Sequence, residues 1–240
     1  MDKADAIRRK RAESLKLLDD LLRATFLDMF GDPSSNPKNH PIIEVRHLLS
    51  NERAGTQSGP FGSALKKYEY VSDGIPVWGI DNVSINKFTD EPYLFISEEK
   101  YQQLQRYSAI NGDILISRAG TVGRMCIVET QYKNSIISTN LVRVVLNKEK
   151  LLPDYFVGLF SYFADRVGSL RVNQKENAFS FLNPTVLKGL PIPVPPIKTQ
   201  TAYSNIVRAR KEIIHKNNVT ALESDILFHS LVARAFKGEL

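Results

Sequence analysis

TQTAYSNIVRARKEIIHKNNVTALESDILFHSLVARAFKGEL, residues 199–240, predicts one long helix around which the rest of the chain is organised. Its apolar residues recur with the 3.6-residue period of a single helix face, first as Ala202, Ile206, Ala209 and Ile213. After the polar break at 216–218, the apolar face continues through Val219, Leu222, Ile226, Leu227 and Leu231. The stretch contains no proline, and its one glycine is Gly238. A long helix with one apolar side needs a partner to cover that side.

A partial copy of this helix lies near the start of the sequence. Under a shift of 210 residues, the identical pairs are Glu13-Ser14 with Glu223-Ser224, Leu17 with Leu227, Leu21 with Leu231, and Phe26 with Phe236. Such a repeat favours one structural role performed twice, although any two leucine-rich helices share some similarity. We predict that the helices pair antiparallel, within one chain or between two chains. The residues predicted to pair are Leu18, Leu21, Leu22, Ile206, Ile213, Leu222, Ile226 and Leu231.

Composition favours an ordinary globular protein, with 42% hydrophobic and 24% charged residues among 240. No stretch predicts a membrane span or a secretory signal, so we expect a cytoplasmic protein without membrane association. The single cysteine, Cys126, excludes a disulfide within these residues and lies in an apolar run, which favours a core position. The formal net charge of +6 favours a polyanionic partner. Because basic and acidic residues are interspersed, binding by charge alone is disfavoured over sequence reading.

The chain is predicted to divide into four segments. Residues 1–31 form a helix that ends at Gly31-Asp32-Pro33, and residues 32–41 form a linker. Residues 42–197 form a β-rich domain, and residues 198–240 form the long C-terminal helix. The predicted fold class is α+β, with one β-rich domain flanked by long amphipathic helices that form an antiparallel coiled coil.

Within the β-rich domain, strands are predicted over 75–80, 93–96, 113–117, 124–128 and 135–146. A short helix follows Ser97, and a longer one begins at Pro153. Asn183-Pro184 matches a helix start. The proline-rich stretch 190–196 must be extended, and it forms a stiff strap that leads into the final helix.

Catalytic motifs are largely absent. The four histidines lack the spacing of a metal site, and no phosphate-binding glycine loop is present. The stretch 182–185 departs at two positions from the motif of an amino-methyltransferase. Glu98 and Lys100, with Asp81 and Asp90 upstream, match part of a nuclease signature that is common on solvated helix starts. We therefore expect no catalytic residue, no metal site and no cofactor.

Several polar loops of the β-rich domain suit nucleic acid. The stretch 53–63 combines small residues with polar side chains, and 117–124 is a glycine turn between two arginines. The stretch 171–177 offers arginine, asparagine and glutamine, which read guanine and adenine edges. Each loop alone also fits a structural turn with exposed polar residues. The candidate DNA-binding residues are Arg53, Gln57, Ser58, Ser63, Lys66, Lys67, Arg118, Thr121, Arg124, Arg171, Asn173, Gln174 and Lys175.

In these residues the sequence resembles the specificity subunits of type I restriction-modification systems. The matching stretches, over nearly the whole chain, are 58–63, 70–80, 112–124, 138–141, 183–196 and 231–240. The resemblance implies a target recognition domain that reads one half of a bipartite DNA site, and helices that form a spacer and hold methyltransferase subunits. Family members usually carry two recognition domains, whereas this sequence carries one with a helix on each side. It also has Thr199 where the family usually has glutamate.

The resemblance implies a non-catalytic subunit. Its expected partners are double-stranded DNA, the methyltransferase (M) subunits and the restriction (R) subunit. Since a bipartite site needs two recognition domains, we expect a homodimer and a palindromic site. One alternative is an interaction scaffold or regulator, derived from such a subunit, that no longer binds DNA. Another is a free-standing nuclease or methyltransferase, which lacks the required residues.

Overall fold

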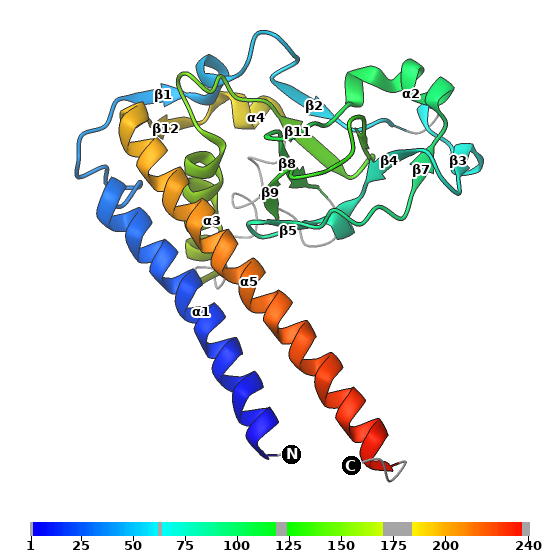
Figure 1. Ribbon diagram of the computed structural model, residues 1–240. Coiled ribbons are helices and arrows are strands. Elements are labelled where there is room, and N and C mark those ends of the chain that lie inside the picture. The colour runs from blue at the N-terminus through cyan, green and yellow to red at the C-terminus, as the bar shows by residue number, and fades with distance from the viewer. Residues whose placement is uncertain (1, 62–63, 119–123, 170–183, 237–240) are drawn as a thin grey trace.

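The computed structural model describes residues 2–61, 64–118, 124–169 and 184–236. A β-rich body carries two long helices, α1 (Asp2–Phe30) and α5 (Ile197–Phe236), which extend away from it together (Figure 1). The two helices contact each other and run in opposite directions, so both ends of the chain lie at the tip of the pair. We call this helix pair the arm.

The ends of the arm helices nearest the body are set by local chemistry. Gly31 has a φ of +77° and donates its N–H to the carbonyl of Leu27 at 2.8 Å, which closes α1 as predicted. The start of α5 follows two prolines, and the amides of Thr199 and Gln200 donate to the carbonyl of Pro196 at 2.9 and 3.2 Å. The arm therefore begins at two fixed points on the body.

Two four-stranded sheets form most of the body. The first is antiparallel, with the order β2 (Thr56–Ser58), β11 (Leu141–Val144), β8 (Ile114–Ser117) and β9 (Met125–Ile127). The second has the order β10 (Ile136–Ile137), β4 (Ile75–Trp78), β7 (Phe95–Ile96) and β3 (Tyr70–Val71), with β10 parallel to β4. Every residue of β8 and β11 is buried, because both strands lie inside the first sheet.

Two short ribbons complete the strands. β1 (Ile42–Glu44) pairs antiparallel with β12 (Pro191–Pro193), and β5 (Val83–Ser84) pairs with β6 (Lys87–Phe88). Because β1 and β12 lie at the start and end of the body, the chain enters and leaves it at one place. The body also contains helices α2 (Glu98–Leu104), α3 (Pro153–Ser169) and α4 (Pro184–Gly189), and the 3-10 helices η1 (Val45–Leu48), η3 (Lys67–Glu69), η4 (Ile80–Asn82) and η5 (Gln105–Tyr107).

An aromatic cluster joins the arm to the body. Phe26 and Phe30 of α1 contact Tyr155 of α3, with ring centroids 5.6 and 4.7 Å apart, and both contact Tyr203 of α5. All four rings are buried. Tyr155 donates its hydroxyl to the carbonyl of Pro193 at 2.7 Å, which ties the cluster to the strap. The base of the arm is thus part of the hydrophobic core.

A second core lies between the two sheets, around the buried Trp78. The indole N–H of Trp78 donates to the hydroxyl of Ser135 at 2.7 Å, and Ser135 donates to the carbonyl of Ala109 at 2.6 Å. Cys126 is fully buried in this core, as predicted from its apolar run, and burial raises the pKa of its thiol to about 12.

The structure contains the unpredicted short strands β1, β2, β3, β5 and β6, and two further differences from the sequence prediction have clear physical causes. The strand predicted over 135–146 is two strands in different sheets, because a turn at Ser138, whose carbonyl accepts from Leu141 N–H at 3.2 Å, carries the chain across. Within this chain α5 packs through Tyr203 and Val207, whereas Ile206 and Ile213 are 41% and 47% exposed. The buried side of α5 is set by the aromatic rings of α1 and α3, and not by its isoleucines.

Residues predicted to pair on α1 also have mixed positions. Leu22 packs against the core and Leu18 is half-buried, whereas Leu21 is 61% exposed. The side chains of Leu222, Ile226 and Leu231 lie outside the described ones. Pairing through the exposed residues therefore stays a prediction about contacts between chains. None of the described helices is long and apolar enough to span a bilayer.

Candidate DNA-binding surface

Three loops meet at one edge of the first sheet, where β2 and β8 end and β11 begins. Gly59 N–H donates to the carbonyl of Leu141 at 3.0 Å, and Arg118 N–H donates to the carbonyl of Asn140 at 2.8 Å. Thr139 donates its hydroxyl to the carbonyl of Pro60 at 2.6 Å. These bonds bring residues 58–61, 117–118 and 138–141 together. We call this set the loop edge.

Gly59 permits the closest contact within the loop edge. A Cβ atom at this position would lie 1.9 Å from the carbonyl oxygen of Ser138, far inside any allowed contact. Only glycine can therefore bring the loop that follows β2 against the turn before β11. The loop edge is consequently a rigid support for the side chains that it carries.

Two cations at this side of the body lie over exposed aromatic rings. The guanidinium carbon of Arg118 lies 5.5 Å from the ring centroid of Phe61, and Lys66 Nζ lies 5.6 Å from that of Tyr68. Phe61 is 59% exposed and Tyr68 is 77% exposed. Cations at these distances are attracted by the ring face. The loops thus present oriented positive charge next to planar apolar surface.

The polar residues predicted to contact DNA differ in their exposure to solvent. Lys66, Lys67 and Arg118 are exposed, and Gln57, Ser58 and Arg124 are half-buried. Gln57 donates its side-chain amide to the carbonyl of Ser58 at 2.8 Å. Apart from Arg53, the remaining predicted residues lie outside the described ones, and they are Ser63, Thr121, Arg171, Asn173, Gln174 and Lys175.

Arg53 has an intramolecular role. Its Nη1 donates to both carboxylate oxygens of Asp113 at 2.9 Å, and its Nη2 donates to the carbonyl of Ser108 at 3.0 Å. The Asp113 side chain is only 4% exposed. Arg143, fully buried beside this pair, donates to three backbone carbonyls, and burial lowers its pKa to about 10. Arg53 therefore helps to hold the sheet and η5 together.

The residues that match a nuclease signature are not gathered into a site. Lys100 pairs with Glu69 at 2.6 Å, and Glu98 accepts from Gln102 at 2.6 Å. Asp90 accepts hydrogen bonds from Thr130 and from the amide of Gln131. Within the described part of the chain, no group of three acidic, histidine or cysteine side chains could hold a metal ion.

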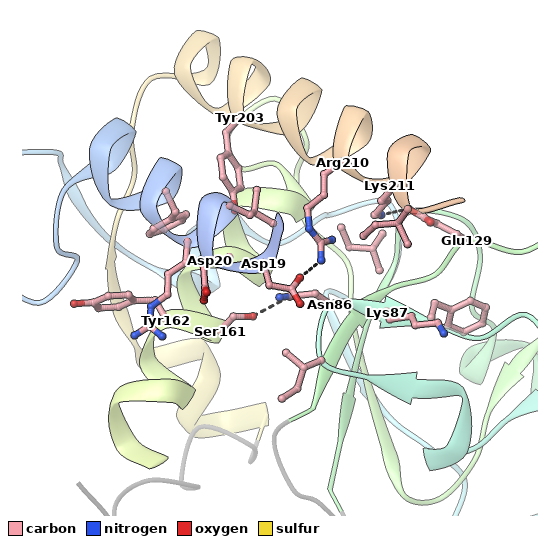
Figure 2. Close-up of a pocket in the computed structure, with 18 of the residues that line it drawn as sticks. Asp19, Asp20, Asn86, Lys87, Glu129, Ser161, Tyr162, Tyr203, Arg210 and Lys211 are labelled. Carbon is pink, nitrogen blue, oxygen red and sulfur yellow. Dashed lines mark hydrogen bonds and ion pairs between the residues drawn. The ribbon is translucent and has the colours of Figure 1, made fainter. Parts of the chain in front are cut away.

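A cleft of about 700 Å³ separates the arm from the body (Figure 2). Arg210 of α5 pairs with Asp19 of α1 across it, and Lys211 pairs with Glu129 of the body. On the other wall, Ser161 donates its hydroxyl to the side-chain oxygen of Asn86 at 2.8 Å. Arg210 and Lys211 are thus both paired within the chain, and the cleft is a junction between arm and body.

A family model described as the type I restriction modification DNA specificity domain matches residues 61–224. The chain belongs to this family. The match includes the loop from Phe61, the sheet strands β8 and β11, and most of α5. This match confirms the resemblance inferred from the sequence. At the level of the family, it also confirms the expectation of a DNA-recognition protein with no catalytic role.

Individual relatives agree with this assignment. One relative is a protein of Methanocaldococcus jannaschii named as a putative type I restriction enzyme MjaX specificity subunit. The two sequences are 28% identical over 179 residues, and the alignment covers 71% of this chain and 39% of that protein. A chain from a study of complex assembly and conformational transition of the type I R-M system has a TM-score of 0.61 at 18% identity, over 100% of this chain and 57% of the other.

The HsdS subunit from Thermoanaerobacter tengcongensis has a TM-score of 0.54 at 17% identity, over 100% of this chain and 56% of the other. At these identities the structural likeness establishes the fold, which confirms the mixed architecture of helices and strands. The chain spans 39% of the length of the M. jannaschii protein and a little over half of the two solved chains.

Sequence reasoning missed the aromatic members of the surface. Phe61 and Tyr68 were left out because large apolar side chains are usually buried and carry no hydrogen-bond donors for base edges. One signal could have identified Phe61, because it lies between Pro60 and Gly62, where no strand or helix can bury it. Its contact with Arg118, 57 residues further along, depends on the folded sheet (Arg118 minus Phe61).

Proposed function

We propose that this chain is a DNA-recognition subunit of a type I restriction-modification complex and that its loop edge reads one half of a bipartite site. The observation that carries the proposal is the rigid loop edge with its exposed cation, in a chain of the DNA-specificity family. Rigid support matters because base readout needs side chains in fixed positions. The described residues proposed to contact DNA are Gln57, Ser58, Lys66, Lys67, Arg118 and Arg124.

Lys66 and Lys67 are proposed to contact phosphates. Both are exposed on the connection between β2 and β3, and a lysine ammonium is a compact charge that suits phosphate more than a base edge. Each neutralised phosphate releases condensed counterions, so the logarithm of the binding constant falls with the logarithm of salt concentration by about 0.9 per contact.

Duplex binding across a salt series tests this role. The double variant Lys66→Ala, Lys67→Ala should lower the magnitude of the salt slope by about 2 and weaken binding to all sequences alike. The matched control is Lys148→Ala, Lys150→Ala, which removes two exposed lysines just beyond the opposite end of β11 and should leave the slope unchanged. A wild-type chain that binds no duplex, with or without methyltransferase subunits, would favour the interaction scaffold instead.

The arm is proposed to bind other subunits through one apolar face. On α5, Ile206 and Ile213 lie about 60–80° to one side of the buried Tyr203, at 100° per residue. On α1, Leu21 and Leu17 lie about 100–140° to the same rotational side of Leu22. Because the helices are antiparallel, equal rotational senses place the two exposed stripes on the same face of the arm. Leu17 is 66% exposed and Leu21 is 61% exposed.

This face lies away from the body. Lys211, which pairs with Glu129, and Arg23, whose guanidinium lies 5.9 Å from the Tyr162 ring, are rotated to the other side of their helices. An exposed apolar stripe on two adjacent helices suits two further helices packed against it. We propose that these come from methyltransferase subunits and from a second copy of this chain, whose recognition domain supplies the second half-site. Docking of the restriction subunit would then follow on the assembled complex.

Light scattering over a concentration series tests the assembly. Ile206→Glu with Ile213→Glu should abolish dimerisation and methyltransferase binding, while the urea midpoint of the body stays unchanged because both side chains are already exposed. The control Arg208→Glu changes an exposed residue of α5 to the same side chain outside the stripe. If the isoleucine variant assembles as the wild type does, the proposed face is not the subunit interface.

A further inference from the structure

Phe61 and Arg118 form a pair that the stability of the fold does not explain. Phe61 is 59% exposed, so most of its ring gains nothing from burial. The guanidinium of Arg118 lies over this ring at 5.5 Å from its centroid. Both side chains project from the loop edge, where strands β2 and β8 end on either side of the turn before β11.

The backbone beneath the pair is fixed on both sides. Arg118 N–H donates to Asn140 O at 2.8 Å, and the carbonyl of Pro60, which precedes Phe61, accepts from Thr139 at 2.6 Å. The ring and the guanidinium are thus positioned through the same short turn. The contact with the ring then restricts the arginine side chain, so that less of its rotamer entropy remains to be lost on binding.

The hydrogen-bonding capacity of Arg118 is also available, unlike that of three other arginines. Arg53 donates to Asp113, Arg46 pairs with Glu44 at 2.6 Å, and the buried Arg143 donates to backbone carbonyls. In the described ranges of the chain, no carboxylate pairs with Arg118, and the phenylalanine ring beneath it accepts no conventional hydrogen bond. Because Arg118 is exposed, its planar set of N–H donors is accessible from solvent.

We infer that Arg118 and Phe61 act as one specificity-determining unit, in which Arg118 donates two hydrogen bonds to a guanine of the half-site and Phe61 holds the guanidinium plane. The inference rests on the proposed DNA-binding function and adds the base that is read. Guanine presents O6 and N7 as adjacent acceptors in the major groove, and the arginine fork matches them in two parallel bonds. Phe61 is a positioning residue whose exposed ring also covers the neighbouring base pair.

The experiment begins with selection of half-sites by the wild-type full chain, with methyltransferase subunits, from random duplexes. Arg118→Lys keeps the positive charge and loses the planar fork. For one guanine of the selected half-site, it should lower discrimination against adenine about 5- to 150-fold. The salt slope should stay at the wild-type value, because the charge is retained. Replacing that guanine with 7-deazaguanine, which lacks the N7 acceptor, should weaken wild-type binding and leave Arg118→Lys binding nearly unchanged.

Phe61 variants separate positioning from bulk. Phe61→Ala should lower discrimination at the same guanine, whereas Phe61→Tyr should retain it because the ring face is kept. Arg46→Lys is the matched control, since Arg46 is exposed near the opposite end of the sheet and should leave selection unchanged. Urea unfolding of each variant identifies any loss of stability, and Arg118→Lys decides the question even if Phe61→Ala is poorly folded.

The outcomes distinguish the inference from the function beneath it. Wild-type discrimination by Arg118→Lys at every guanine would overturn the inference while leaving DNA recognition intact, and it would make Arg118 a phosphate contact or a bystander. A half-site without guanine would overturn it equally. Failure of the wild-type complex to select any sequence would reject the proposed function, and the inference with it.

Discussion

Replacing either member of the Arg53–Asp113 pair should destabilise the protein, and the two replacements should differ in size. Asp113 accepts two bonds from Arg53 and one from the amide of Ile110 at 2.9 Å, and its side chain is 4% exposed. Arg143 lies beside the pair, and burial and repulsion from Arg53 lower its pKa while Asp113 raises it. Asp113 thus lies close to both guanidinium groups and interacts favourably with each.

The magnitudes follow from what each change leaves behind. Asp113→Ala leaves two cations in a poorly solvated site and should cost about 3–5 kcal/mol, as when one partner of a buried ion pair is removed. Arg53→Met keeps most of the side-chain volume, and Asp113 keeps the Ile110 amide and the charge of Arg143. Since Arg53 is 27% exposed, this change should cost less, about 1–3 kcal/mol. The double variant should cost less than the sum of the two, because the pair is removed together.

Urea unfolding measures these costs through the fluorescence of Trp78, the single tryptophan, which is fully buried between the sheets. Slopes against urea concentration should agree among the variants, so that midpoints report stability. Folded Arg53→Met should keep the wild-type salt slope for duplex DNA, because in the wild-type protein the Arg53 guanidinium is already bound to Asp113. A larger loss for Arg53→Met than for Asp113→Ala, or full additivity, would refute this account of the site.

Three further changes test the core and its titration. Phe26→Ala should lower the free energy of unfolding in urea by about 3–5 kcal/mol, because the ring is 2% exposed. Leu17→Ala, at an exposed position of the same helix, should lower it by under about 0.5 kcal/mol. Equal losses in the two variants would contradict the aromatic cluster. The Cys126 thiol, whose pKa burial raises to about 12, should react with iodoacetamide only on unfolding, and rapid native labelling would contradict its burial. Burial raises the pKa of Asp154, so its charged form costs stability above that pKa and the cost disappears as pH falls through it. Asp154→Asn should therefore raise the urea midpoint at about pH 7 more than at about pH 4, and the reverse order would contradict that sign.

Local chemistry made several elements predictable from the sequence. Gly31 ends α1 because a positive φ suits glycine, and Ser97 caps α2 by accepting the amide of Lys100 at 3.1 Å. The buried strand β8 follows from its apolar run. These features depend on residues within a few positions of one another, where propensity and hydrogen bonding decide the structure.

Features that depend on distant partners could not be derived in this way. The turn at Ser138 interrupts the strand predicted over 135–146 because its amide donates to the carbonyl of Trp78 at 2.8 Å in the other sheet. Arg53 has the residue type of a DNA contact, and only the fold reveals that Asp113, sixty residues away, occupies it. The polar loops were recognisable, whereas the contact of Arg118 with the Phe61 ring required the register of β2, β11 and β8.

The aromatic cluster also sets the order in which the protein can be completed during synthesis. Phe26 finds Tyr203 only after 177 further residues have been added (203 minus 26). At about 5–20 residues per second, the part of the first helix that packs against Tyr203 of α5 remains uncovered for roughly 9–35 s on the ribosome. Until Tyr155 of α3 and then Tyr203 have been made, the Phe26 and Phe30 rings are available to chaperones or to a neighbouring nascent chain. The recognition domain can therefore form before the two helices of the arm close on each other.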